Sequence, residues 1–164
     1  MNEDVERVRR LLERSGSNAT IRTFDAAVPS AAAAAEQLGC PPGAIANSLV
    51  FKVDDRPLLV LASGAHRVDT GRVANLLGVG KKKVRRADPE FVTQATGQHV
   101  GGVAPVGHPA PMRTLVDHAL TTYDTVWAGA GDEHSMFSTT ATELVTLTQG
   151  ELADIAAAAT DGAE

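Results

Sequence analysis

The sequence has one cysteine, few aromatic residues and no long apolar run, and each scarcity excludes a class of protein. Cys40 stands alone, so the chain cannot form an internal disulfide, as is typical of proteins from a reducing compartment. Aromatic residues make up 4%, so a core must be built mainly from Val, Leu, Ile and Ala. No segment approaches the length of a membrane span, and the acidic N-terminus lacks the apolar stretch of a signal peptide. We therefore expect a cytoplasmic protein that does not associate with membranes.

The motifs of common metal and nucleophile sites are missing as well. The five histidines are scattered, and none has the His-x-x-x-His spacing of a zinc site. We therefore expect no metal ion and no other cofactor. The sequence also lacks a Gly-x-Ser-x-Gly elbow, a Walker loop and a dinucleotide-binding fingerprint. Cys40 lies beside Pro41 at a predicted turn and is expected to be structural.

What is present is the composition of an ordinary globular domain, with 43% apolar and 21% charged residues. The 164 residues suit a single domain over 1–164 with a substantial core. The net charge of −5 disfavours broad, nonspecific nucleic-acid binding. One basic stretch is either a solvated face or a contact for phosphates, and it comprises Lys81, Lys82, Lys83, Arg85 and Arg86.

Hydrophobic periodicity and capping residues predict helices and strands that are interspersed along the chain. The predicted helices span residues 2–16, 29–39, 68–78, 88–97 and 140–150. The predicted strands span 18–24, 82–87, 114–120, 124–131 and 134–140, with a β-hairpin over 46–64. This order favours a mixed sheet with flanking helices, so the predicted fold class is α/β. The tail, 159–164, is expected to fray.

One residue of the predicted hairpin raises a question of its own. Alternation along the strand places Asn47 at the head of an otherwise apolar face that includes Phe51. Burying an amide without partners costs roughly 1–3 kcal/mol. Asn47 must therefore have hydrogen-bond partners or face a polar cavity.

A long segment rich in glycine and proline, residues 96–111, is the most unusual part of the sequence. Gly101 and Gly102 would let a ligand approach main-chain N–H groups, which bind an anion or an oxyanion. Pro105 would fix the shape of this loop. A plain surface connection is the alternative, although the length exceeds that of most connections and favours function.

A second turn bordered by glycines, residues 129–138, leads into a predicted strand. His134 and Ser135 lie at the start of that strand, where side chains can reach a cavity at the end of a sheet. His134 could donate a hydrogen bond or exchange a proton near neutral pH. Stabilising the turn is the alternative for this residue.

In order along the chain, these segments resemble the YbaK/ProX family, which is related to the editing domain of bacterial prolyl-tRNA synthetase. The resemblance covers about residues 20–155. It is carried by SLVFK at 48–52, LLVLASGAHRVD at 58–69, LLG at 76–78, KKVRRADPE at 82–90, TGQHVGGVAPVGH at 96–108, LVDHAL at 115–120, VWAGAGDEHSMF at 126–137 and TELVTLTQGELADI at 142–155.

The resemblance implies a free-standing aminoacyl-tRNA deacylase, which hydrolyses the ester of a mischarged tRNA. It also implies a mixed, partly barrel-like sheet surrounded by helices. The expected partners are the aminoacylated 3′ end of tRNA and an aminoacyl-tRNA synthetase. The family's Gly-x-x-x-Pro loop falls on Gly101 to Pro105 and is associated with the terminal adenosine and the ester.

The resemblance also points to site residues, with one departure from the family pattern. Members with established editing usually carry a Lys where this chain has Asn47. A neutral hydrogen bond is weaker than a charged one by about 1–2 kcal/mol, or about tenfold in rate. A noncatalytic protein that binds aminoacyl-tRNA, or another aminoacylated or nucleotide ligand, is therefore the alternative. The expected catalytic residues are Asn47, Gly101, Gly102 and His134, and the expected substrate contacts are Phe51, Ser63, His66, Pro105, Ser135, Lys81, Lys82 and Lys83.

Overall fold

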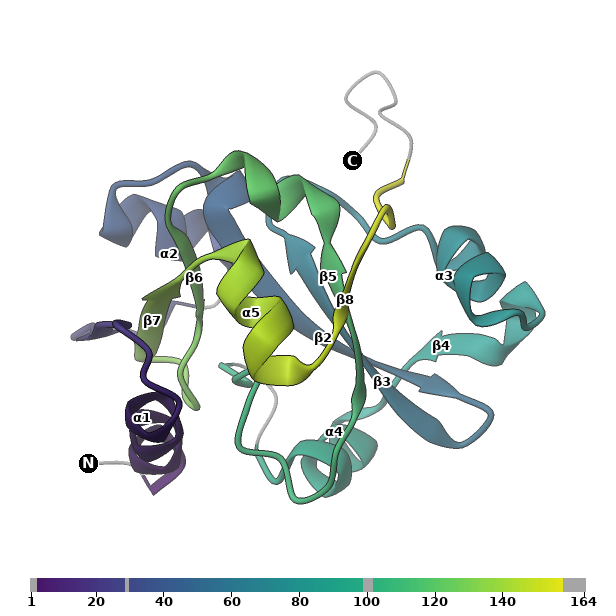
Figure 1. The fold of residues 1–164 in the computed structure, drawn as a ribbon, viewed down its shortest axis with the longest axis horizontal. Helices are drawn as coiled ribbons and strands as arrows, with labels where there is room; N and C mark the ends of the chain where they lie inside the picture. The colour runs from purple at the N-terminus through teal and green to yellow at the C-terminus, as the bar shows by residue number, and fades with distance from the viewer. Residues whose placement is uncertain (1–2, 29, 99–101, 158–164) are drawn as a thin grey trace.

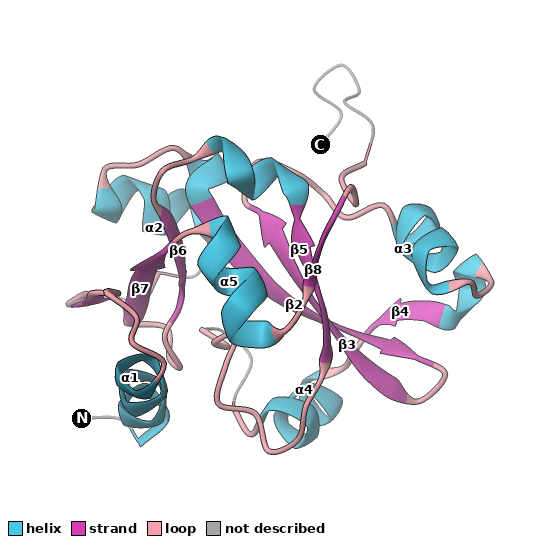
Figure 2. Cartoon of the chain, viewed as in Figure 1, coloured by secondary structure: helices cyan, strands magenta, loops and turns pink. Residues whose placement is uncertain are grey.

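The computed structural model describes residues 3–28, 30–98 and 102–157 (Figures 1 and 2). Its helices are α1 (Glu3–Arg14), α2 (Ala31–Leu38), α3 (Thr70–Leu77), α4 (Pro89–Thr96) and α5 (Ala141–Thr148). Its strands are β1 (Ile21–Thr23), β2 (Ile45–Val53), β3 (Arg56–Ser63), β4 (Val84–Arg86), β5 (Arg113–Asp117), β6 (Val126–Gly129), β7 (Ser135–Thr139) and β8 (Glu151–Ala153). The predicted helices are confirmed, while the tail predicted to fray lies outside the described residues.

Local side-chain chemistry sets where the helices begin. Ser30, Asp69, Asp88 and Thr140 each occupy the N-cap position, and the side chain of each accepts a hydrogen bond from a main-chain N–H of the first turn. Glycines in the left-handed conformation end α2, α3 and α4. The helix boundaries predicted from capping residues are therefore confirmed at these positions.

Two strand predictions need correction, and one strand was not predicted. The strand predicted over 82–87 is shorter, because Lys81–Lys83 form a 3₁₀ turn before β4. The strand predicted over 114–120 ends at Asp117, whose carboxylate accepts the N–H of Ala119 and starts another 3₁₀ turn. Strand β8 was not predicted, since three residues are too few to show a period.

Strands β2 and β3 form the predicted hairpin. They are antiparallel and pair Asn47 with Ala62 and Val53 with Arg56. The turn residues Asp54 and Asp55 both have positive φ, at 48° and 67°, as a two-residue type I′ turn requires.

The sheet is mixed and open, in the order β1-β7-β6-β2-β3-β5-β8, and β4 also pairs with β2. Strand β2 therefore has two neighbours on one side. It pairs in parallel with β6 at Ile45 and Ala46 and antiparallel with β4 from Phe51 to Val53. Between them, residues 47–50 have a neighbouring strand only on the β3 side. Figure 1 shows β6 and β4 lying apart along β2. We call this interruption the split. The predicted α/β class, with a mixed sheet and flanking helices, is confirmed, and the sheet does not close into a full barrel.

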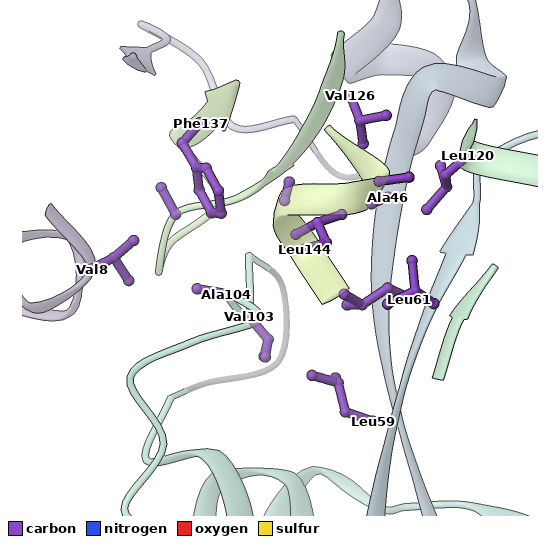
Figure 3. Close-up of a cluster of buried hydrophobic side chains, with 14 of the residues drawn as sticks. Val8, Ala46, Leu59, Leu61, Val103, Ala104, Leu120, Val126, Phe137 and Leu144 are labelled. Atoms are coloured by element: carbon purple, nitrogen blue, oxygen red, sulfur yellow. The ribbon is translucent and has the colours of Figure 1, made fainter. Parts of the chain in front are cut away.

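Alternation along β2 and β3 divides the core between the two faces of the sheet. One face packs against α1, α4 and α5, and Figure 3 shows Val8, Leu59, Leu61 and Leu144 among its converging side chains. The other face carries Phe51, Leu58 and Val60, which pack against α3, and Ile45, which packs against α2. Strand β2 pairs with both β6 and β4 and thus positions both edges of the split.

Candidate active site

A pocket of about 400 Å³ opens at the split. Residues from both faces of β2 line it, because the missing strand neighbour leaves a passage beside the chain. Ser48 and Val50 lie on the face that packs against α5, and Asn47 and Leu49 lie on the other. The remaining lining residues are Val28, Ser30, Ala31, Ala34, Ile45, Ala46, Arg86, Val92, Gly102, Val103, Gly129, Asp132, Glu133, Ser135 and Met136.

Asn47 lines this pocket, which is one of the two alternatives that its place on the strand face left open. Its amide forms no hydrogen bond to any other residue that the structure describes. The amide keeps one acceptor and two donor hydrogens for a ligand or water. The question raised by the sequence thus has a structural answer: Asn47 faces a cavity.

Ser48 also lines the pocket and was missed in the sequence. Among the described residues its Oγ is the one buried side-chain polar atom without a hydrogen-bond partner. In the sequence it lies between Ala46 and Val50 on a core-facing alternation and resembles an ordinary small core residue. What distinguishes Ser48 from a core residue is its place in the split. The split depends on strand pairing between distant segments and leaves no local signal in the sequence.

Gly102 lines the pocket, and it also packs closely against the main chain of Asp132. Its φ is +89°, and a Cβ at this position would collide with the main chain of Asp132. The Gly102 carbonyl accepts the N–H of Gly131 at 2.9 Å. The glycine is therefore required for the close approach of the 131–132 turn. Gly101 lies outside the described residues, and Pro105 is buried without lining the pocket.

The structure separates the two residues predicted at the start of β7. Ser135 is 3% exposed and lines the pocket. His134 is exposed, its Nδ1 lies 3.2 Å from the Phe24 carbonyl oxygen, and its main-chain N–H donates to Asp132 Oδ1. These contacts are those of the turn-stabilising alternative. A catalytic role for His134 stays a prediction.

Phe51, Ser63 and His66 do not line the pocket. Phe51 is 2% exposed in the core, with the Arg86 guanidinium 5.7 Å from its ring centre. Ser63 Oγ donates to the Gly43 carbonyl at 2.7 Å, and His66 Nδ1 lies 3.6 Å from Asp117 Oδ2. The structure thus gives these three side chains other contacts, and the predicted contact with substrate is not supported by the pocket geometry.

The basic stretch approaches the pocket only at its end. Lys81, Lys82 and Lys83 are exposed and do not line the pocket, whereas Arg86 does. Lys83 Nζ lies 3.3 Å from Asp54 Oδ1, an ion pair that water screens. The stretch therefore forms an exposed basic rim that begins at Arg86.

Folding shifts the pKa values of two side chains, His108 in the glycine- and proline-rich loop and Cys40 in the turn after α2. Burial lowers the pKa of His108, and its hydrogen bond to the Ala104 carbonyl opposes this to a smaller extent. Burial raises the pKa of the Cys40 thiol, which suits a structural residue.

Among residues 3–28, 30–98 and 102–157, no three His, Cys, Asp or Glu side chains converge as a metal site would require. None of the helices in these ranges is long and apolar enough to cross a membrane.

Comparison with known proteins gives matches along most of the chain. A crystal structure of a candidate trans-editing enzyme for prolyl tRNA synthetase is 35% identical, with a TM-score of 0.88 over 96% of this chain and 99% of that one. The uncharacterized protein YwhH of Bacillus subtilis is 29% identical over 76% of this chain and 78% of its own length. The proline–tRNA ligase of a Geobacillus species is 35% identical over 60% of this chain, which corresponds to 17% of the ligase.

A family model described as the aminoacyl-tRNA editing domain matches residues 25–147. This match and the trans-editing neighbour support aminoacyl-tRNA deacylation and do not favour the noncatalytic alternative. The resemblance seen in the sequence is thereby confirmed. The chain belongs to the aminoacyl-tRNA editing domain family.

Proposed function

We propose that this chain acts in trans as an aminoacyl-tRNA deacylase, with the pocket at the split as its active site. The observation that carries the proposal is the polar wall of that pocket. Asn47, Ser48 and Ser135 line it, and their side chains form no hydrogen bonds to other described residues. Proteins rarely gather uncommitted polar groups in one cavity unless a ligand or water binds there.

The reaction is hydrolysis of the ester that joins the amino acid to the terminal ribose. A water oxygen attacks the ester carbonyl carbon, and the electron pair of the C=O bond moves to the carbonyl oxygen. When the C=O bond re-forms, the ribose oxygen leaves and takes up the proton that the water lost. The products are a free amino acid and an uncharged tRNA. No protein nucleophile is needed, so the protein's part is to position the ester and stabilise the developing oxyanion.

Asn47 is assigned a hydrogen bond to the ester or to the attacking water. Its amide is neutral, so this hydrogen bond is worth about 0.5–1.5 kcal/mol, against about 1.5–3 kcal/mol for a charged donor. Asp132 and Glu133 also line the pocket and carry the negative charge suited to the α-ammonium group of an aminoacyl ester. The pocket is therefore expected to hold the ester without a charged donor at position 47.

The basic rim is assigned to the tRNA backbone. Lys81, Lys82 and Lys83 are exposed, and Arg86 connects the rim to the pocket. Replacing the three lysines with Ala should weaken tRNA binding and reduce its salt dependence. Replacing the exposed residues Arg10, Arg14 and Arg113 with Ala removes the same charge at a distance from the rim and serves as the control. Equal losses of tRNA affinity in both variants would show that the rim is a solvated face without a specific role in binding.

A panel of charged tRNAs tests the proposal. The relatives named above direct the panel first to tRNA for proline, charged with proline and with a series of noncognate amino acids, followed by other noncognate pairs. Release of the amino acid from at least one mischarged tRNA by the wild type, and slower release by Asn47→Ala, is the expected result. Binding of tRNA with hydrolysis of no member of the panel would contradict it.

A further inference from the structure

Ser48 combines two features that occur together in no other described residue. Its Oγ is buried without a partner among the described residues, although such a hydroxyl ordinarily costs stability. Ser48 is also one of the residues that line the pocket. A buried polar atom kept without a protein partner indicates a group reserved for a ligand or a water molecule.

The main chain of Ser48 faces the same space. In an antiparallel ladder, alternate residues direct both main-chain groups to the same neighbour. The Gly64 N–H donates to the Ile45 carbonyl at 2.8 Å, so the main-chain N–H and C=O groups of Ile45, Asn47 and Leu49 point towards β3. Ser48 must therefore direct its N–H and C=O away from β3.

On that side Ser48 has no strand beside it. Pairing with β6 ends at Ala46, and the Val50 carbonyl already accepts the Ala87 N–H at 3.0 Å. The N–H of Ser48 consequently projects into the split. One residue thus presents two donors, a hydroxyl and a main-chain N–H, to the same pocket.

The surroundings make these donors effective. Val50, Val92 and Val103 line the pocket on the same side and provide an apolar environment. Hydrogen bonds to a developing negative charge are strongest where water is excluded and the donors are already oriented. The carboxylates of Asp132 and Glu133 also belong to the pocket wall and suit the ammonium group, which leaves the carbonyl oxygen for the donors.

We infer that Ser48 holds the carbonyl oxygen of the aminoacyl ester through its hydroxyl and its main-chain N–H. This inference rests on the proposed function and adds a catalytic residue to the same site. As the oxygen gains negative charge during attack by water, both hydrogen bonds strengthen. Ser48 therefore stabilises the transition state more than the bound substrate.

Ser48→Ala tests the inference through single-turnover deacylation of a tRNA that the wild type hydrolyses. The rate constant should fall roughly 10- to 100-fold, as for the loss of one donor to an oxyanion. The thermal midpoint should stay the same or rise, because the lost hydroxyl has no partner. Ser138→Ala on β7 is the control, since Ser138 Oγ accepts the Thr20 N–H and does not line the pocket.

A second pair of variants isolates the hydroxyl from shape. Ser48→Thr keeps the hydroxyl and Ser48→Val has the same shape without it. Both residues suit a strand. The Thr variant should deacylate at least tenfold faster than the Val variant. Equal rates for Thr and Val, or for Ser48→Ala and the wild type, would overturn the inference.

Binding separates failure of this inference from failure of the proposed function. The probe is 3′-alanylamido-3′-deoxyadenosine, an amide analogue that keeps the carbonyl, measured by calorimetry. If the wild type hydrolyses no charged tRNA, the proposed function fails. The role of Ser48 is then decided by whether Ser48→Ala weakens binding of this analogue at least threefold. Unchanged affinity would overturn it.

Discussion

Two polar clusters beside the β2–β3 hairpin differ in how their hydrogen-bonding groups are used. In the first, Asp117 is 2% exposed, and its carboxylate accepts the N–H groups of Ser63 and Ala119 at 3.0 and 2.9 Å. Ser63 Oγ donates to the Gly43 carbonyl and accepts the Ala65 N–H. In the second, the split, Asn47 and Ser48 form no side-chain hydrogen bonds within the described residues.

The difference separates groups that stabilise the fold from groups available to a ligand. Removing a satisfied group such as Asp117 leaves its partners unpaired and should reduce stability. Removing an unsatisfied one such as Ser48 should leave stability intact and reduce activity. Both clusters contain a serine, beside the Asp117 carboxylate in the first and beside the Asn47 amide in the second. They differ in whether these side chains already have hydrogen-bond partners in the protein.

Replacement of Asp117 with Ala should have the largest effect on stability. It leaves the buried N–H of Ser63 and the half-buried N–H of Ala119 without an acceptor, at about 1–3 kcal/mol each. Urea unfolding should show a loss of roughly 2–6 kcal/mol. Asp154→Ala is the control, because its ion pair with Arg72 lies at the surface and is worth less than about 1 kcal/mol. Comparable losses in both variants would break the comparison.

Gly102→Ala should disturb the pocket wall together with the fold. The new methyl group would meet the main chain of Asp132, and φ is +89°. Gly78→Ala is the matched control, because Gly78 has φ +71° but open space around it, so only the conformational cost of about 1–2 kcal/mol applies. We expect a larger loss of unfolding free energy and of deacylation for Gly102→Ala. A loss no greater than that of Gly78→Ala would show that this close approach is unimportant.

Asn47→Ala should change activity without changing stability. Loss of one neutral hydrogen bond of about 0.5–1.5 kcal/mol corresponds to a roughly 2- to 12-fold lower deacylation rate. Asn75→Ala removes the same amide from the exposed face of α3 and should leave the rate unchanged. Asn47→Lys supplies a charged donor and should raise the rate about tenfold if the ester contacts this position. An unchanged rate in both Asn47 variants would remove this residue from the mechanism.

His108 should give the smallest effect, as a pH dependence of stability. Burial lowers its folded-state pKa below the usual value of 6.5, so the unfolded chain binds the proton more readily. The contribution is present above pH 6.5 and is lost as pH falls towards the lowered pKa. Thermal midpoints between pH 7.5 and 5 should fall less steeply for His108→Gln than for the wild type. An identical pH profile would contradict this assignment, and exposed His118→Gln is the control.

Much of the fold was predictable because its signals are local. Caps such as Ser30 and Asp69, and the stop at Gly39, are written within a few residues of each helix end. The split was not predictable, because it depends on pairing of β2 with β6 and β4, which lie far apart in the sequence. Alternation and the family resemblance together pointed to Asn47, whereas neither gave a signal at Ser48.

The same reasoning explains the residues that the structure moved away from the pocket. Ser63 and His66 are residue types common in active sites, but folding brings distant residues into contact with them. Ser63 hydrogen-bonds to Gly43 and Asp117, and His66 lies beside Asp117. His134 is adjacent to Ser135 in sequence, yet its ring lies by the carbonyl of Phe24. Residue type and sequence order therefore identified the region, and tertiary contacts decided which side chains it contains.

The most direct measurement is a crystal structure with 3′-alanylamido-3′-deoxyadenosine bound. It distinguishes the split from the Asp117 cluster in one experiment. We predict that the analogue occupies the pocket, with its carbonyl oxygen within hydrogen-bonding distance of Ser48 and with Asn47 beside the amide. An analogue bound beside Ser63 and His66, or elsewhere with the split unoccupied, would contradict the central claim.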